Sequence, residues 1–179
     1  YRRDEDPLGL DVRQVPMYIK DGIGSISAAL RDPMPPFDPA SKKKPGFAAR
    51  ACEGESNYTK YDLKVADLAC EWLACDVAAD IEKPWCLYVS FLSPHYPLTV
   101  PEPFFSMYDP ADMPDPKLDP ECGYERHPWV GVVALRQPHA NGLTPEKSRA
   151  AMAAYLGLCS FIDHQIGRVL DALETAGLI

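Results

Sequence analysis

The stretch CLYVSFLSPHYP, residues 86–97, is a hydrophobic run that ends in a histidine between two prolines. Its first part is short, rich in aromatic and branched residues, and apolar on both alternating faces. That pattern is typical of a central strand of a parallel sheet whose two sides are covered by helices. In open α/β sheets, ligands bind beyond the carboxyl ends of the strands. The sequence therefore predicts that a strand over 85–92 delivers His95 to a ligand-binding edge.

The prolines around His95 suggest why this residue is held in place. Pro94 and Pro97 restrict the backbone on both sides of it. An imidazole held this way suits proton transfer near neutral pH, or hydrogen bonding to an oxyanion. A structural histidine that bonds a nearby carbonyl fits the pattern equally well. The residues alone leave both readings open.

A helix is predicted before this strand, from about Tyr61 to Cys75. Thr59 is a good N-cap, and Asp62 three residues later completes a capping box. A helix directly before a buried strand indicates an α/β layered domain. The predicted apolar face consists of Tyr61, Val65, Leu68, Ala69, Trp72 and Leu73.

The clearest predicted helix lies at the end of the chain. Thr144-Pro145-Glu146 supplies an N-cap, a proline at the first helical position and an acid in the first turn, and Gly177 is a fitting stop. Asp163 lies at the edge of the apolar stripe of this helix. The predicted stripe consists of Ala151, Tyr155, Leu158, Ile162, Ile166, Val169 and Leu173.

Long irregular segments make up the rest of the chain. Residues 1–57 are loop-rich, with a short strand predicted at Val15–Ile19, and the lysine run at 42–44 is read as a solvated loop. The segment over 98–143 contains Asp109, Asp112, Asp115 and Asp119, together with His127 and His139. A surface loop is favoured there over a calcium site, because the glycine and terminal glutamate of an EF-hand loop are missing. Both histidines are read as plain loop residues.

Composition narrows the classes of function. The 179-residue chain has a net charge of −8, which makes a nucleic-acid partner improbable, and no apolar run approaches the length of a membrane helix. The six cysteines contain no C-x-x-C pair. Cys70, Cys86 and Cys159 are predicted to be buried free thiols, which favours a reducing compartment such as the cytoplasm. Both ends of the sequence suggest cuts through a longer chain, so the terminus that would carry a signal peptide is expected elsewhere.

Two blocks of residues resemble the sulfatase family of the alkaline-phosphatase-like superfamily. One is Lys83-Pro84-Trp85 with the run to Pro97, and the other is the helix from Ala154 to Leu170. The segment Gly54–Asp62 is similar to bacterial choline sulfatases and phosphonate monoester hydrolases. The resemblance covers roughly residues 54–179. It implies an α/β fold: part of a loop-rich alkaline-phosphatase-like sandwich with a mostly parallel central sheet flanked by helices. Residues 1–179 then form a single partial catalytic domain, with a helix–strand–loop–helix portion over 58–179.

The resemblance also implies a chemistry, the hydrolysis of sulfate esters. In that family a formylglycine formed from a C/S-x-P-S-R motif attacks sulfur, and a divalent cation, usually calcium, holds the sulfate. His95 aligns with the family histidine after the central strand, which implies a hydrogen bond to the sulfate oxygens and help in protonating the leaving group. For Asp163 two roles stay open: a partly buried carboxylate that supports a residue of the site from behind, or a partner of a neighbouring loop.

The departures from the family pattern limit what this chain does by itself. It contains no C/S-x-P-S-R motif and no Gly-Lys-x-x-His, and the acidic pair that would follow the last helix is absent. Nucleophile and metal ligands are therefore expected outside this segment, which alone should be inactive. We expect a sulfate ester as the partner of the parent enzyme, and leave open whether that enzyme is a homo-oligomer. The alternatives are a phosphate or phosphonate ester hydrolase of the same superfamily, and a non-catalytic scaffold that serves as an interaction module.

Overall fold

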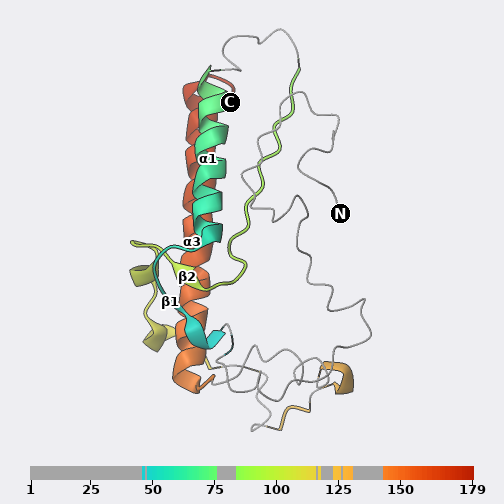
Figure 1. Cartoon of the computed structure of the whole chain (residues 1–179), viewed down its shortest axis with the longest axis vertical. Coiled ribbons are helices and arrows are strands. Elements are labelled where there is room, and N and C mark those ends of the chain that lie inside the picture. Colours follow the sequence, from blue (N-terminus) through green and yellow to red (C-terminus); the bar gives the residue numbers. More distant parts are fainter. Residues whose placement is uncertain are drawn as a thin grey trace.

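The computed structural model shows two long helices and a small parallel sheet (Figure 1). The predicted strand at Val15–Ile19, the lysine run at 42–44, Asp119 and His139 lie outside the residues that the structure describes. The described residues are 46, 48–75, 84–115, 117, 123–125, 127–130 and 143–179.

Helix α1, Asn57–Cys75, begins before the predicted start at Tyr61. The Ser56 N–H donates to Thr59 Oγ1 at 2.8 Å, and the Thr59 N–H donates to Ser56 Oγ at 3.1 Å. This reciprocal pair is the capping box of the helix, so Ser56 is the N-cap and the predicted Thr59–Asp62 box was wrong. The carboxylate of Asp62 is thereby left for a contact outside its own helix.

Helix α3, Pro145–Thr175, has both of its predicted ends. Thr144 Oγ1 accepts a hydrogen bond from the Lys147 N–H at 3.3 Å, and Pro145 occupies the first helical position. Beyond the last turn, Gly177 takes a φ of 70°, which a residue with a Cβ adopts only at a cost. Its N–H donates to the carbonyl of Glu174 at 2.9 Å. Local capping chemistry therefore fixes the full length of this helix.

The two helices lie side by side and run in the same direction (Figure 1). Small residues such as Ala66 and Ala69 lie on the buried face of α1 and allow a close approach. Across this contact, Arg168 donates to Asp67 Oδ1 at 2.6 Å. The residues of α1 buried most deeply are Thr59, Asp62, Ala66, Ala69 and Leu73. Those of α3 are Ala151, Ala153, Ala154, Gly157, Leu158, Phe161 and Gln165.

The buried faces are rotated from the predicted ones. In α3, Tyr155 is 47% exposed and Ile166 43% exposed, so placing them in the buried stripe was wrong, whereas Ala151 and Leu158 are buried as predicted. In α1, Leu73 is buried as predicted, but Tyr61 is only half-buried. Both helices carry apolar side chains over more than one face, and periodicity alone cannot tell which of them the neighbouring helix covers.

A short parallel sheet packs against α3 (Figure 1). Strand β1, Cys52–Glu53, pairs with β2, Thr99–Val100, with Cys52 opposite Thr99. Val100 forms the core there with Ala154 and Leu158 of α3. The described residues thus combine helices with parallel strands, as an α/β fold does.

The predicted central strand is the main difference between sequence and structure. Residues 84–92 run along α1 without pairing into a sheet within the described part of the chain (Figure 1). Tyr88 is 86% exposed, and Trp85 rests edge-on against Trp72 of α1, with ring centroids 5.4 Å apart. A strand needs a neighbour for its backbone hydrogen bonds, and no described residue supplies one. Within the described residues the segment therefore forms no sheet strand, and its place in a central sheet stays a prediction.

Cysteine burial was also only partly predicted. Cys86 is exposed because it lies in the unpaired segment, while Cys70 and Cys159 are half-buried rather than buried. Five cysteines, Cys52, Cys70, Cys75, Cys86 and Cys159, are free thiols. In the described part of the chain, no helix has the length and apolar character needed to cross a membrane.

Candidate active site around His95

The turn over 92–95 carries the candidate catalytic histidine. The His95 N–H donates to the Leu92 carbonyl at 3.0 Å and closes the turn. The His95 ring is exposed, so it can meet a ligand. It also lies 4.2 Å from the Tyr96 ring, centroid to centroid. The backbone of the turn is thus fixed by hydrogen bonding while the imidazole remains accessible.

The two ring nitrogens of His95 have different surroundings. Nδ1 lies 2.7 Å from the carbonyl oxygen of Tyr96. A carbonyl oxygen can only accept, so Nδ1 carries the proton in this contact. The structure shows no partner for Nε2 among the described residues, so that nitrogen is available for a further hydrogen bond. Such a bond at one nitrogen sets the tautomer and the orientation of the ring.

Helix α1 supports this turn through a buried carboxylate. Asp62 is 0% exposed, and its Oδ1 accepts from the Leu92 N–H at 2.6 Å. Its Oδ2 accepts from the Ser93 N–H at 2.9 Å. Burial raises the pKa of the neighbouring Tyr61 hydroxyl, and the Asp62 carboxylate raises it further. Asp62 therefore binds the backbone of the turn with both of its oxygens.

A second residue of α1 touches the histidine itself. Tyr58 lies one helical turn before Asp62, and its ring meets His95 edge-on, with centroids 5.5 Å apart. Residues four apart share one face of a helix, so Tyr58 and Asp62 reach the turn together. Sequence reasoning missed both roles, because thirty-odd residues separate them from the turn. Their spacing gave no signal either, because the predicted helix began at Tyr61 and did not include Tyr58.

The other predicted site residue, Asp163, lies apart from this constellation. It is exposed on α3 rather than partly buried, and no described residue binds its carboxylate. Its neighbour His164 packs near Phe104, with ring centroids 5.6 Å apart. The structure therefore does not bring Asp163 to His95, and its role in supporting the site stays a prediction.

The acidic residues of the loop after β2 have local roles. Asp109 Oδ1 accepts from the Ala111 N–H at 2.8 Å and caps the short 3₁₀ helix η5, Pro110–Asp112. Asp115 pairs with Arg149 of α3 at 2.7 Å. His127 Nδ1 accepts from the Trp129 N–H at 3.2 Å. Among the described residues, no group of three or more His, Cys, Asp or Glu side chains could hold a metal ion.

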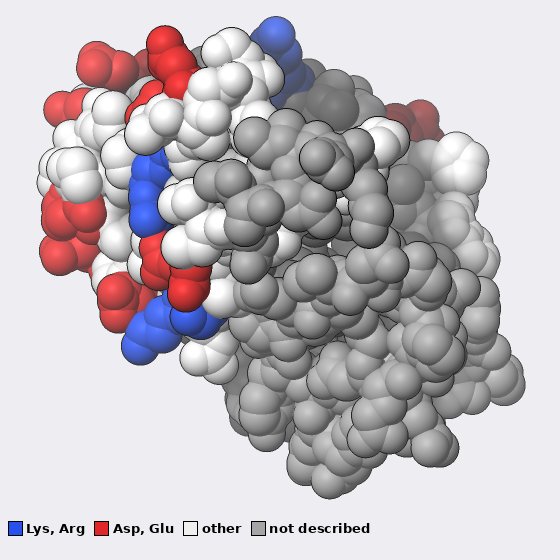
Figure 2. All heavy atoms as spheres, turned by 90° about the horizontal axis from the view of Figure 1, so that it is seen from above, with Lys and Arg blue, Asp and Glu red and all other residues white. Residues whose placement is uncertain are grey.

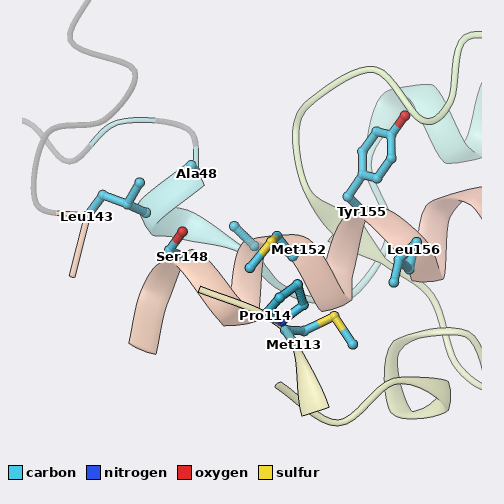
Figure 3. Close-up of a pocket in the computed structure, with 9 residues that line it drawn as sticks. Ala48, Met113, Pro114, Leu143, Ser148, Met152, Tyr155 and Leu156 are labelled. Atoms are coloured by element: carbon cyan, nitrogen blue, oxygen red, sulfur yellow. The ribbon is translucent and has the colours of Figure 1, made fainter. Parts of the chain in front are cut away.

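A cavity of about 380 Å³ lies elsewhere, beside the first turns of α3 (Figure 3). Met113, Pro114 and Met152 gather around it (Figure 3). Neither His95 nor any residue found in contact with it lines this space. An apolar lining offers no charged donor to an ester dianion or monoanion, so the cavity is not the site suggested by His95.

Charge on the described surface is mixed. Seen along the helices, acidic side chains are spread over the described residues with basic ones between them (Figure 2). No continuous basic patch forms on the described part of this face. Positive charge for an anionic substrate is thus not concentrated on it.

Comparison with known proteins places the chain in a family. The family model described as Sulfatase matches residues 29–178. The chain belongs to the sulfatase family. It is 37% identical over 101 residues to an arylsulfatase of Clostridium perfringens, covering 55% of this chain and 20% of that protein. It is 29% identical over 132 residues to a choline-sulfatase of Rhizobium meliloti, covering 69% of this chain and 25% of the relative.

A third relative, a sulfatase of Formosa agariphila, is 26% identical over 141 residues, covering 76% of this chain and 28% of that protein. Across these three, the sulfatase-family chain spans between 20% and 28% of the relatives' length. The family membership confirms the resemblance seen in the sequence. It supports a hydrolase of sulfate esters as the general activity of the family to which this chain belongs.

Proposed function

We propose that this chain is part of the catalytic domain of a sulfatase and that His95 contacts the sulfate group. The observation that supports this role is the state of the ring: Nδ1 is bonded to the Tyr96 carbonyl at 2.7 Å, and the residue is exposed. Because Nδ1 keeps its proton for the Tyr96 carbonyl, Nε2 is an acceptor in the neutral ring and a donor only in the imidazolium form. In that form Nε2 can donate to a sulfate oxygen, where negative charge is spread, or to the departing ester oxygen. The substrate class proposed is a sulfate monoester.

The remaining catalytic groups are expected outside this chain. The described residues offer no cluster that fits a divalent cation, for which calcium is our expectation, and the sequence has no C/S-x-P-S-R motif from which a formylglycine could form. We therefore assign no step to either group here. His95 acts on the non-bridging oxygens or on the leaving group, and its turn sets where the ester oxygens lie.

The proposal extends to the fold. We propose that residues 85–92 are a strand of a mostly parallel central sheet in the complete sulfatase, with α1 and α3 among its flanking helices. The short run of aromatic and branched residues, apolar on both alternating faces, supports this placement. His95 would then follow the carboxyl end of a strand, where α/β folds bind their ligands.

The test is turnover of aryl and choline sulfates by the full-length enzyme. His95→Ala is expected to lower kcat by ~100-fold or more, the range for loss of a positioned acid or base. His127→Ala is the matched control, because His127 is an exposed histidine that bonds only locally. Unchanged turnover in His95→Ala would remove the residue from the site. Faster turnover of the matching phosphate or phosphonate esters would assign the enzyme to the alternative substrate class.

A further inference from the structure

Asp62 is the residue whose contacts exceed what helix packing requires. It is fully buried, and among the described residues its carboxylate binds two backbone N–H groups, those of Leu92 and Ser93. A buried charge is costly unless hydrogen bonds compensate for it. An aliphatic side chain at this position would leave the Leu92 and Ser93 N–H groups without an acceptor, so the carboxylate serves the turn rather than the packing of the helix.

The bonds form a short chain from Asp62 to the histidine. The Leu92 N–H donates to Asp62 Oδ1 at 2.6 Å, and the Leu92 carbonyl accepts from the His95 N–H at 3.0 Å. A single residue thus connects the carboxylate to the backbone of His95. Charge-assisted bonds of this kind are shorter and stronger than bonds between neutral groups.

The turn is held through its backbone and not through its own side chain. Ser93 is buried, yet its Oγ has no hydrogen-bond partner among the described residues, whereas its N–H is bound by Asp62 at 2.9 Å. Tyr58, on the same face of α1, adds an edge contact to the His95 ring. Helix α1 therefore fixes both the main chain and the ring orientation.

We propose that Asp62 is a positioning residue for His95, acting through the backbone of the turn over 92–95. This inference rests on the proposed function of His95. The reaction rate depends steeply on where a catalytic group lies, since a displacement of about 1 Å can lower the rate ~100-fold. Asp62 touches no substrate in this account; it keeps the imidazole where the ester oxygens will lie.

The experiment compares kcat and KM of full-length variants with sulfate esters. In Asp62→Asn one oxygen still accepts, but the amide nitrogen opposes the second N–H, so kcat is expected to fall ~10-fold to ~100-fold with little change in KM. Asp67→Asn is the control on the same helix, because Asp67 is exposed and its partner among the described residues is Arg168. It is expected to leave kcat unchanged.

A double variant separates positioning from general destabilisation. If Asp62 acts through His95, Asp62→Asn in the His95→Ala background should lower kcat by less than twofold more, because residues that act as a unit are not additive. If the kcat loss of the double variant instead equals the product of the losses of the two single variants, the proposal is overturned. Hydrogen exchange provides an independent readout: the Leu92 and Ser93 amides should exchange faster in Asp62→Asn than in Asp67→Asn, and equal rates would also overturn it.

Two further outcomes are informative. If His95→Ala retains full turnover, the proposed function fails, whatever the exchange rates of the two amides show. If His95→Ala loses activity and Asp62→Asn does not, only the positioning role fails. Should Asp62→Asn not fold, Asp62→Glu keeps the carboxylate but displaces it by one methylene. That variant is expected to lose kcat ~10-fold, and an unchanged kcat would overturn the proposal.

Discussion

At the scale of single residues, Gly157 marks the closest approach of α3 to the turn after β2. A Cβ placed there would lie 2.7 Å from the Phe104 carbonyl oxygen and 3.0 Å from Val100 Cγ1. The first of these is a backbone atom and cannot rotate away. Val100 belongs to the core with Leu158, so a shift of this turn would disturb the packing of the sheet against α3.

Gly157→Ala is therefore expected to destabilise the protein, by about 1–3 kcal/mol as overpacking does. Gly167→Ala is the matched control in the same helix, where a Cβ would meet nothing within 4 Å. That control should stabilise by up to about 1 kcal/mol, because alanine favours a helix over glycine. Denaturant unfolding of both full-length variants measures the difference. Equal midpoints would contradict the close approach.

Single residues of the site also show why it was only partly predicted from the sequence. His95 could be found because two prolines and a preceding apolar run are adjacent to it in the sequence. Asp62 and Tyr58 could not, because their contacts with the turn join distant parts of the chain. Asp62 was read as half of a capping box, a local role that Ser56 and Thr59 fill instead. Local chemistry competed with a tertiary contact, and only the structure separates them.

At the scale of elements, the first turn of α3 combines three stabilising features. Thr144 caps the helix, Pro145 starts it, and Glu146 adds negative charge where the helix dipole is positive. Two hydrogen bonds lower the pKa of the Glu146 carboxyl: the larger effect comes from the Thr144 side chain, and the smaller one from the backbone N–H of Glu146 itself. The ionised form is therefore favoured in the folded protein.

The sign of the pH effect follows from that direction. Because the pKa of Glu146 is lower in the folded protein than in the unfolded chain, its ionised carboxylate stabilises the fold at a pH above the unfolded pKa. This stabilisation is lost as the pH falls through the folded pKa. Glu146→Gln should thus lower the unfolding midpoint slightly at neutral pH, and the difference should vanish in acid below the ordinary glutamate range. Glu174→Gln at the other end of α3 is expected not to destabilise, because a negative charge there opposes the helix dipole. A deficit in Glu146→Gln that persists in acid would contradict this account.

Element ends and element faces differ in how well they could be predicted. Both ends of α3 were predicted because caps and breakers are local signals. Its buried face was not, since Tyr155 and Ile166 extend an apolar pattern onto the exposed side. Strands β1 and β2 were missed because each has only two residues, too few for any alternation.

At the scale of the whole molecule, apolar surface is left uncovered around the helices. Tyr88, Ile166 and Leu170 are each at least 43% exposed. This sulfatase-family chain matches relatives of which it covers 20% to 28%. The segment over 84–92 has the composition of a buried strand but lacks sheet partners among the described residues. These observations are the grounds for the proposed central strand, whose neighbours would belong to the complete sulfatase domain.

Hydrogen exchange on the full-length protein tests this placement. If residues 86–91 form a central strand, both neighbours bind their backbone, and their amides should exchange ~100-fold or more slowly than in an unstructured peptide. Amides within α3 provide the internal reference, because their hydrogen bonds are already satisfied in the helix. Exchange over 86–91 at the rate of a free peptide would contradict the strand. The N–H groups of Leu92 and Ser93 would still bind Asp62. His95 would then not follow the carboxyl end of a sheet strand, and its place in the fold would no longer support a role in catalysis.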